Sequence, residues 1–226
     1  MKVAVIGANG KVGRLVCDKL KKVEDYDPVA FVRSEEQSKY FKEDVGIDAS
    51  LTSIEESTVA QIAQAFKDHD IEAVVFSAGA GGKDIERIFT VDLDGCCKVV
   101  DACEEAGVSR FIEVSAINAE ERTFWYHTAL RNYYIAKKSA DHYIRGTNLE
   151  YTILQPGMLV TGKETGKLVT LDLLETKKDS FYAIDRDDLA EVIVKIVQHS
   201  KGTIRRTIPL ANGGLDIDDF LKTLYE

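Results

Sequence analysis

The 226-residue sequence has few of the residues that mark disulfide-bonded, metal-binding or membrane proteins. Its four cysteines include no C-x-x-C pair, and its four histidines lack the H-E-x-x-H spacing, so neither a disulfide framework nor a metal site is indicated. No apolar run approaches the roughly 20 residues that a membrane helix needs. Acidic residues outnumber basic ones by 38 to 29, and a net charge of −9 disfavours nucleic-acid binding. We therefore expect no metal, no nucleic-acid partner and no membrane association.

The remaining composition is that of an ordinary globular protein. Hydrophobic residues make up 45% and charged residues 30% of the chain, which is enough to fill a sizeable core. The first apolar run begins at Lys2 and leaves no room for a signal or transit peptide, so we expect a cytoplasmic protein. The cysteines are expected to be small buried thiols, with a reactive thiol as the alternative.

Short β-branched runs alternate with amphipathic stretches along the whole chain. Strands are expected at residues 2–6, 29–32, 46–48, 73–76, 110–114, 151–154 and 203–210. Helical spacing of apolar residues covers 12–23, 34–41, 55–66, 84–106, 128–145, 187–198 and 217–225. This alternation predicts a Rossmann-like α/β fold, a doubly wound parallel sheet with helices on both faces. Because no change of composition marks a linker, residues 1–226 are expected to form one domain, with about 156–226 on the substrate side.

A glycine-rich loop follows the first predicted strand and opens the first predicted helix. It reads G-A-N-G-K-V-G, and its expected cofactor contacts are Gly7, Asn9, Gly10, Lys11, Val12 and Gly13. Gly7 permits the turn out of the strand, Gly10 lets a pyrophosphate approach the backbone, and Gly13 lets the helix pack on the sheet. The alternative is a glycine turn that serves only strand–helix packing.

The end of the second strand is where a dinucleotide fold distinguishes NADP from NAD. In NAD-binding proteins an acidic residue at this position binds the ribose 2′-hydroxyl. This sequence has Arg33 and Ser34 there instead. A guanidinium suits a 2′-phosphate, so the sequence favours NADP over NAD. The alternative is a solvated arginine at the start of a charged helix. Asp48, after the expected third strand, is a candidate contact to the adenine edge or simply a turn residue.

A Y-x-x-x-K pattern supplies the candidate catalytic pair, Tyr133 and Lys137. On a helix the two side chains share a face, and a neighbouring ammonium lowers the pKa of a phenol. Proton exchange with a substrate oxygen then becomes feasible, and the lysine can hydrogen-bond the nicotinamide ribose. Tyr134 with Lys138 is a competing register, and a structural helix-face pair is a further alternative.

Ser115 ends the fifth predicted strand. The carboxyl ends of such strands face the crevice where ligands bind, so its hydroxyl could orient a substrate carbonyl. The alternative is a serine that caps a turn at the end of the strand.

Together these residues resemble the atypical short-chain dehydrogenase/reductases, in particular the small NAD(P)H-binding branch related to NmrA-like proteins and to flavin/biliverdin-IXβ reductases. The resemblance spans nearly the whole chain. The further cofactor contacts that it implies are Ser77, Ala78 and Gly79 after the fourth strand, and Pro156, Gly157 and Met158 beside the nicotinamide.

The sequence also departs from this family. Ser115 and Tyr133 are 18 residues apart, which is wider than the family's usual spacing. Residues 120–126 hold the extra length and could form a substrate lid or a hydrophobic loop folded onto its own helix. Only 70 residues follow Pro156, which disfavours a nucleotide-sugar substrate.

Two functions fit this resemblance. The first is an NADP(H)-dependent oxidoreductase that acts on a small carbonyl, quinone or flavin-like compound, with Tyr133 exchanging the proton, Lys137 supporting it and Ser115 orienting the oxygen. The second is a non-catalytic NADP(H)-binding regulator of the NmrA-like type. In either case we expect a small-molecule ligand and a monomer or weak homodimer.

Overall fold

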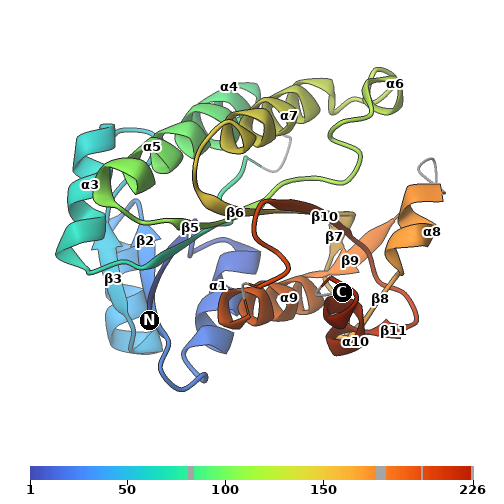
Figure 1. The fold of residues 1–226 in the computed structure, drawn as a ribbon. Helices are drawn as coiled ribbons and strands as arrows, with labels where there is room; N and C mark the ends of the chain where they lie inside the picture. The colour runs from blue at the N-terminus through green and yellow to red at the C-terminus, as the bar shows by residue number, and fades with distance from the viewer. Residues whose placement is uncertain (81–83, 177–181, 200, 225–226) are drawn as a thin grey trace.

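A seven-stranded parallel sheet forms the centre of the molecule (Figure 1). The computed structural model describes residues 1–80, 84–176, 182–199 and 201–224. The strand order is β10–β6–β5–β4–β1–β2–β3, and all neighbouring pairs are parallel. The strands are β1 (Lys2–Ile6), β2 (Asp27–Val32), β3 (Asp48–Leu51), β4 (Ala73–Phe76), β5 (Arg110–Val114), β6 (Glu150–Pro156) and β10 (Arg206–Leu210). This confirms the predicted Rossmann-like fold.

Helices cover both faces of the sheet, as the alternation predicted. One face is covered by α1 (Lys11–Leu20) and α9 (Arg186–Gln198), and the other by α3 (Val59–Asp68), α5 (Cys96–Ala106) and α7 (Arg131–Arg145) (Figure 1). The shorter helices are α2 (Glu35–Lys39), α4 (Ile85–Arg87), α6 (Arg122–Trp125), α8 (Leu171–Thr176) and α10 (Ile217–Lys222), with π-helical segments η1 (Tyr40–Val45) and η2 (Ile88–Gly95). Two small sheets pair β7 (Met158–Val160) with β9 (Ala183–Asp185), and β8 (Lys167–Leu168) with β11 (Leu215–Asp216).

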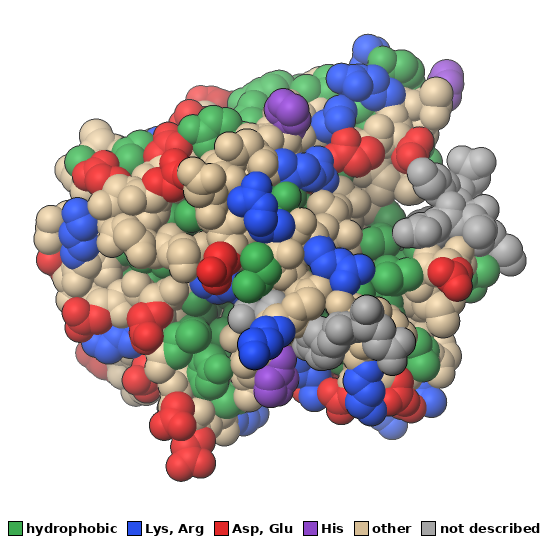
Figure 2. Space-filling model, viewed as in Figure 1, with side chains coloured by type: hydrophobic (Ala, Val, Ile, Leu, Met, Phe, Trp, Pro, Cys, Tyr) green, Lys and Arg blue, Asp and Glu red, His purple; other side chains and the backbone are tan. Residues whose placement is uncertain are grey.

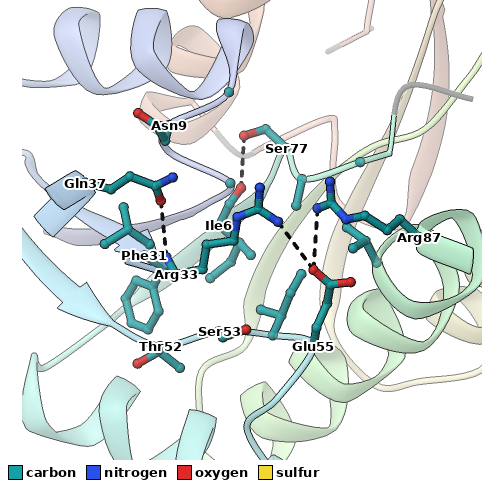
Figure 3. Close-up of a pocket in the computed structure, with 17 residues that line it drawn as sticks. Ile6, Asn9, Phe31, Arg33, Gln37, Thr52, Ser53, Glu55, Ser77 and Arg87 are labelled. Carbon is teal, nitrogen blue, oxygen red and sulfur yellow. Dashed lines mark hydrogen bonds and ion pairs between the residues drawn. The ribbon is translucent and has the colours of Figure 1, made fainter. Parts of the chain in front are cut away.

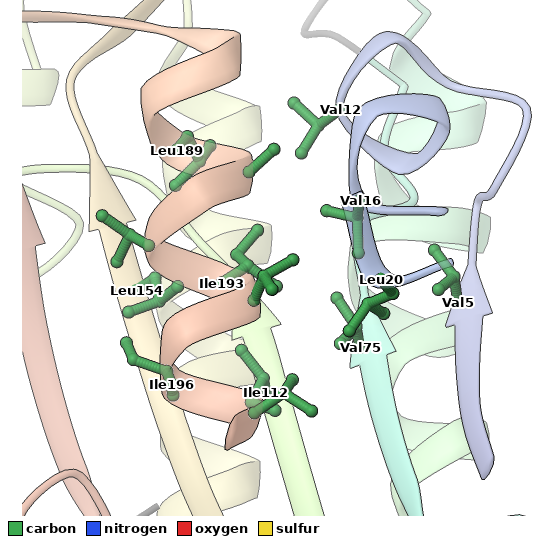
Figure 4. Packing of buried hydrophobic residues seen from close by; sticks show 14 of the residues in the cluster. Val5, Val12, Val16, Leu20, Val75, Ile112, Leu154, Leu189, Ile193 and Ile196 are labelled. Atoms are coloured by element: carbon green, nitrogen blue, oxygen red, sulfur yellow. The ribbon is translucent and has the colours of Figure 1, made fainter. Parts of the chain in front are cut away.

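The alternating side chains of each strand divide the core into two layers. In β1, Val3 and Val5 pack in the cluster that includes α1 and α9, whereas Ala4 and Ile6 pack in the cluster that includes α3 and α5. Figure 4 shows α1 and α9 side by side, with apolar side chains directed at the strands. Because both faces of the strands are buried, their sequences read as continuous apolar runs.

Several element boundaries differ from the prediction. The third strand was expected at 46–48 but forms at Asp48–Leu51. The helix expected from residue 55 begins at Val59, because Thr58 and Gln61 form a capping box there. The helix expected over 84–106 is divided into α4, η2 and α5, and it ends at Gly107, whose φ is +78°. The two small sheets and α8 have no strong periodicity and were not predicted.

The surface carries intermixed charges. On the face shown in Figure 2, Lys and Arg side chains lie among Asp and Glu side chains and do not gather into one broad patch. Among the residues that the structure describes, none of the helices combines the length and the apolarity needed to span a membrane.

Candidate functional site

The glycine-rich loop after β1 is packed tightly between α1 and the segment that follows β4. Gly7 has a φ of +78°, and a Cβ there would lie 2.6 Å from the Cα of Ala78. A Cβ on Gly13 would lie 2.4 Å from the Gly7 carbonyl oxygen. These two positions therefore require glycine. Gly10 is different, because its Cβ would meet only that carbonyl oxygen, at 3.1 Å.

Helix α1 begins at this loop with its amino end uncapped by a side chain. Gly10 is its N-cap residue, and within the described chain no side chain accepts a hydrogen bond from the first turn. The loop itself is held by Arg14, whose Nη2 donates to Asn9 Oδ1 at 2.5 Å and whose guanidinium stacks on the Tyr40 ring at 4.4 Å. Unsatisfied N–H groups at the positive end of a helix dipole fit a phosphate group.

A cavity of about 240 Å³ lies beside the glycine loop (Figure 3). Its lining comes mainly from the carboxyl ends of β1, β2, β3 and β4, which is the edge where ligands bind in this type of sheet. The predicted cofactor residues that line it are Gly7, Asn9, Gly10, Arg33, Ser77, Ala78 and Gly79. Lys11, Val12, Gly13 and Ser34 are adjacent in the chain and are not in the lining. The cavity has the position that an adenine dinucleotide requires.

Three charged side chains meet at one wall of the cavity. Oε2 of Glu55 lies 3.6 Å from Nη1 of Arg33 and 3.4 Å from Nη2 of Arg87 (Figure 3). The other oxygen of Glu55 accepts a 2.8 Å hydrogen bond from the Thr90 hydroxyl. Arg33 is thus where the sequence placed it, after β2, but it is paired with a carboxylate.

Asp48 does not lie at the cavity, and its predicted adenine contact is not supported. Because β3 begins at Asp48, its carboxylate lies at the amino edge of the sheet, where it contacts Nδ1 of His69 at 2.8 Å. The residues that follow β3 and line the cavity are 52–55. Ser34 serves as the N-cap of α2 and accepts a hydrogen bond from the Gln37 N–H at 3.3 Å.

A buried ion cluster surrounds Lys137. The Lys137 side chain is 1% exposed, and its ammonium lies 2.7 Å from Oε1 of Glu113 on β5 and 3.7 Å from Oδ1 of Asp92 on η2. The other oxygen of Asp92 accepts a 2.8 Å hydrogen bond from the Ala80 N–H. Asp92 therefore joins Lys137 to the segment after β4, which lines the cavity through residues 77–79. Of the glycine-rich stretch that continues this segment, residues 81–83 lie outside the described chain.

Ser115 lies at the edge of the same cluster, after β5, where its neighbours include Asp141 and Gln155. Its hydroxyl donates to Oδ2 of Asp141 at 2.8 Å, and Gln155 Nε2 donates to the same oxygen at 3.0 Å. The Ser115 proton is therefore already engaged by a buried carboxylate, which leaves its lone pairs for a ligand.

Carboxylates outnumber cations in this cluster. Lys137 keeps its proton, because Glu113 and Asp92 hold its pKa well above the usual range in spite of burial. Burial raises the pKa of Glu113 to about 7, which outweighs the opposing effect of Lys137. Burial also raises the pKa of Asp141, and its Oδ1 has no hydrogen-bond partner within the described residues. Lys137 and Arg145, whose Nη2 lies 4.0 Å from Oδ2 of Asp141, supply two positive charges against three carboxylates, so a proton is readily retained here.

Tyr133 lies one turn before Lys137 on α7, and its phenol remains protonated at neutral pH. The sequence argument expected the ammonium to lower the pKa of this phenol. Lys137 does act in that direction, but burial outweighs it and raises the pKa of Tyr133 to about 12. The carboxylates of Asp92 and Glu113, which pair with Lys137, also raise the pKa of this phenol. A neutral phenol is a proton donor.

The competing register has different surroundings. Lys138 lies toward the surface, where its ammonium pairs with Glu120 at 2.5 Å. Tyr134 is 8% exposed and stacks on Trp125 of α6 at 6.4 Å between ring centroids. Trp125 is itself buried and donates through Nε1 to the Ala119 carbonyl oxygen at 3.1 Å. Residues 120–126 thus pack partly onto α7, as the hydrophobic-loop alternative expected.

Pro156 ends β6, and Gly157 and Met158 follow it, at the same edge of the sheet as Ser115. The carbonyl oxygen of Pro156 accepts from the Ile117 N–H at 2.9 Å, which places the ends of β5 and β6 together. A Cβ on Gly157 would lie 2.5 Å from the Tyr182 carbonyl oxygen, and Met158 is exposed. None of the three lines the cavity beside the glycine loop.

Several residues of the site were missed by sequence reasoning. Glu55, Arg87, Asp92, Glu113 and Asp141 carry ordinary charges in ordinary helix or strand patterns. A carboxylate at Glu113, inside an apolar strand, was the one local signal, because buried charges require a partner. Placing the third strand correctly would have brought residues 52–55 into consideration.

Comparisons with known proteins agree with this geometry. Residues 7–200 match the family model described as NAD(P)H-binding. The chain is 55% identical to the UPF0659 protein YMR090W of Saccharomyces cerevisiae over 99% of each chain. It is 38% identical to Bacillus subtilis YhfK, named an uncharacterized sugar epimerase, over 99% of this chain and 100% of that one. A solved structure from Bacillus halodurans, assigned by name as an NAD-dependent epimerase/dehydratase, has a TM-score of 0.87 at 33% identity, with 99% of each chain covered.

The raised pKa of Glu113 predicts a pH dependence of stability. The ordinary pKa of this carboxyl is 4.5. Between pH 4.5 and about pH 7, Glu113 is therefore protonated in the folded chain and ionised in the unfolded chain. The contribution of Glu113 to the free energy of unfolding is therefore full below pH 4.5 and is lost as the pH rises through 7. Urea unfolding of wild type and Glu113→Gln should show that the wild type's relative stability declines from about pH 5 to pH 8. Glu105→Gln, on the exposed side of α5, is the matched control. The raised pKa of Glu113 is contradicted if the free energy of unfolding of wild type, minus that of Glu113→Gln, stays constant or grows with pH.

Proposed function

This chain belongs to the family of NAD(P)H-binding proteins, and from that premise we propose that it is an NADP(H)-dependent oxidoreductase that reduces a small carbonyl, quinone or flavin-like compound. One observation carries the proposal. A charged lysine is joined through Asp92 to the segment that lines the dinucleotide cavity, and a protonated tyrosine precedes that lysine by one turn of the same helix. We infer that Tyr133 would be the proton donor to a substrate bound next to the nicotinamide.

The residues of the cavity fit such a cofactor. The part of the cavity lined by Gly10 and the uncapped start of α1 would hold the pyrophosphate. The adenosine end would lie among the residues that follow β2 and β3, with Arg33 in reach of a 2′-phosphate. This support favours NADP over NAD, because a guanidinium gains little from a ribose hydroxyl.

The chain's own residues would manage the proton of the reduction. When bound, NADPH supplies a hydride to the substrate. Tyr133 would donate its phenolic proton to the substrate oxygen, and its pKa of about 12 keeps that proton in place until the oxygen becomes basic. Lys137 would stabilise the phenolate that remains, because Glu113 and Asp92 keep its ammonium charged.

Ser115 would act as a positioning residue. Its hydroxyl proton is held by Asp141, so the serine oxygen would accept a hydrogen bond rather than polarise a carbonyl. The sequence suggested that the Ser115 hydroxyl would donate to a substrate carbonyl, so this role is the reverse. A serine oxygen that accepts a hydrogen bond would suit the hydroxyl group of the reduced product. Pro156, Gly157 and Met158 would border the substrate, since the end of β6 lies next to the end of β5.

The proposal is tested by comparing two neighbouring tyrosines. We expect wild type to oxidise NADPH with at least one member of a carbonyl and quinone panel, and Tyr133→Phe to be slower by about 100-fold or more. Tyr134→Phe is the matched control, because it removes a hydroxyl one residue away and should keep most of the activity. NADPH titrations should show that both variants still bind the coenzyme.

The other outcomes of this experiment are equally informative. If wild type binds NADPH and reduces nothing, the chain is better described as a non-catalytic NADP(H)-binding regulator. If the two tyrosine variants are equally active, Tyr133 is not the proton donor. Activity on flavin alone that survives Tyr133→Phe points to direct flavin reduction, which needs no tyrosine proton.

The coenzyme preference is tested at Arg33. We expect Arg33→Asp to weaken NADPH binding by about tenfold or more, because a carboxylate would face the 2′-phosphate. NADH binding should change far less, since it has no such group. Lys42→Asp makes the same change of charge on an exposed residue outside the cavity and is the control. Equal losses for NADPH and NADH in fluorescence titrations contradict the 2′-phosphate assignment.

A further inference from the structure

We propose that Arg87 is a second ligand of the coenzyme's 2′-phosphate, and that Glu55 is an internal competitor that occupies the two arginines until the phosphate arrives. This inference rests on the proposed use of NADP(H). It goes further because it assigns a specificity role to two residues outside the glycine loop and outside the end of β2.

The geometry presents one anionic oxygen to two cations. Oε2 of Glu55 is 3.4 Å from Nη2 of Arg87 and 3.6 Å from Nη1 of Arg33, and Figure 3 shows both guanidinium groups turned toward it. Arg33 follows β2, Arg87 lies on α4 and Glu55 follows β3, so three separate segments converge. A phosphate oxygen placed between two guanidinium groups has the same requirements as this carboxylate oxygen.

Arg87 also carries an unused donor. Its Nε is buried and has no hydrogen-bond partner within the described residues. Arg87 lines the same cavity as Gly10 and Arg33. A buried donor without a partner is costly, and a ligand oxygen would relieve that cost. This unpartnered donor is independent of the ion pairs and is consistent with a ligand at Arg87.

Glu55 is held in place for this competition. Its second oxygen accepts a hydrogen bond from Thr90 at 2.8 Å, and its carbonyl oxygen accepts from Nζ of Lys98 at 3.2 Å. The carboxylate carries one charge, whereas a phosphate monoester carries about −1.5 to −2 at neutral pH. The phosphate therefore competes successfully for both arginines, but it must overcome the Glu55 pairs and the repulsion between two anions.

NAD(H) offers no group for this exchange. With a ribose hydroxyl in place of the phosphate, both arginines would remain on Glu55. Glu55 therefore lowers the affinity for NADP(H) selectively, which speeds release of the phosphorylated coenzyme and leaves NAD(H) unaffected.

The test measures binding of NADPH, NADH and adenosine 2′,5′-bisphosphate to the full chain by calorimetry. Glu55→Gln keeps the Thr90 hydrogen bond and removes the charge, and it should tighten NADPH and the bisphosphate by about three- to tenfold. Arg87→Gln should weaken both by about tenfold. NADH should change by less than about twofold in either variant. Thermal unfolding of each variant checks that it is folded.

Two control variants isolate the effect of position from that of charge. Glu56→Gln makes the same change as Glu55→Gln one residue further on, at an exposed side chain, and Lys42→Gln removes a surface cation. Both should leave all three dissociation constants near those of wild type.

The contradicting results separate this inference from the proposed function. If NADPH binds and depends on Arg33, but folded Glu55→Gln and Arg87→Gln bind it as wild type does, the competitor role is wrong and the proposed function stands. Weaker NADPH binding in Glu55→Gln also overturns the inference. If wild type binds neither coenzyme, the proposed function itself fails.

Discussion

The close packing of three backbone segments at the end of β1 determines how this molecule is organised. The Gly7–Ala78 and Gly13–Gly7 approaches leave no room for a Cβ, so the loop, α1 and the segment after β4 can meet only through glycine. This packing sets the start of α1 beside the carboxyl ends of the central strands. The anion-binding end of the helix and the cavity follow from one steric constraint.

A second constraint is the excess of buried negative charge around Lys137. Glu113 lies on a central strand, Asp92 on η2 and Asp141 on α7, so the carboxylates come from the sheet and from the helical layer that contains α5 and α7. Buried ion pairs are weak sources of stability, and such clusters are retained where charge or protons are needed. Here the cluster keeps an ammonium charged and a phenol neutral, and it is linked by the Asp92–Ala80 hydrogen bond to the cofactor cavity.

The sequence predicted the features that depend on local residue patterns, and it missed those that depend on contacts between residues far apart in the chain. The glycine spacing, β1 and β4 were read correctly, because buried strands have continuous apolar runs. β3 was misplaced because an edge strand of four residues, D-A-S-L, has little such pattern, and Asp48 was misassigned with it. The predicted direction of the Tyr133 pKa shift was wrong because burial of the phenol outweighs the effect of Lys137. The carboxylates of Asp92 and Glu113, which only the fold brings to Lys137, act in the same direction as burial.

The central claim, that the glycine loop binds a dinucleotide, is tested most directly at Gly10. A Cβ on Gly10 would meet only the Gly7 carbonyl oxygen, at 3.1 Å, and a small backbone shift would accommodate it. Gly10→Val should therefore still fold, which thermal unfolding checks, and its side chain should occupy the space proposed for the pyrophosphate. Calorimetric titration should show one NADPH bound per wild-type chain and no binding of NADPH or NADH to Gly10→Val. Binding of neither coenzyme to wild type, or equal binding to the folded variant, would contradict the account.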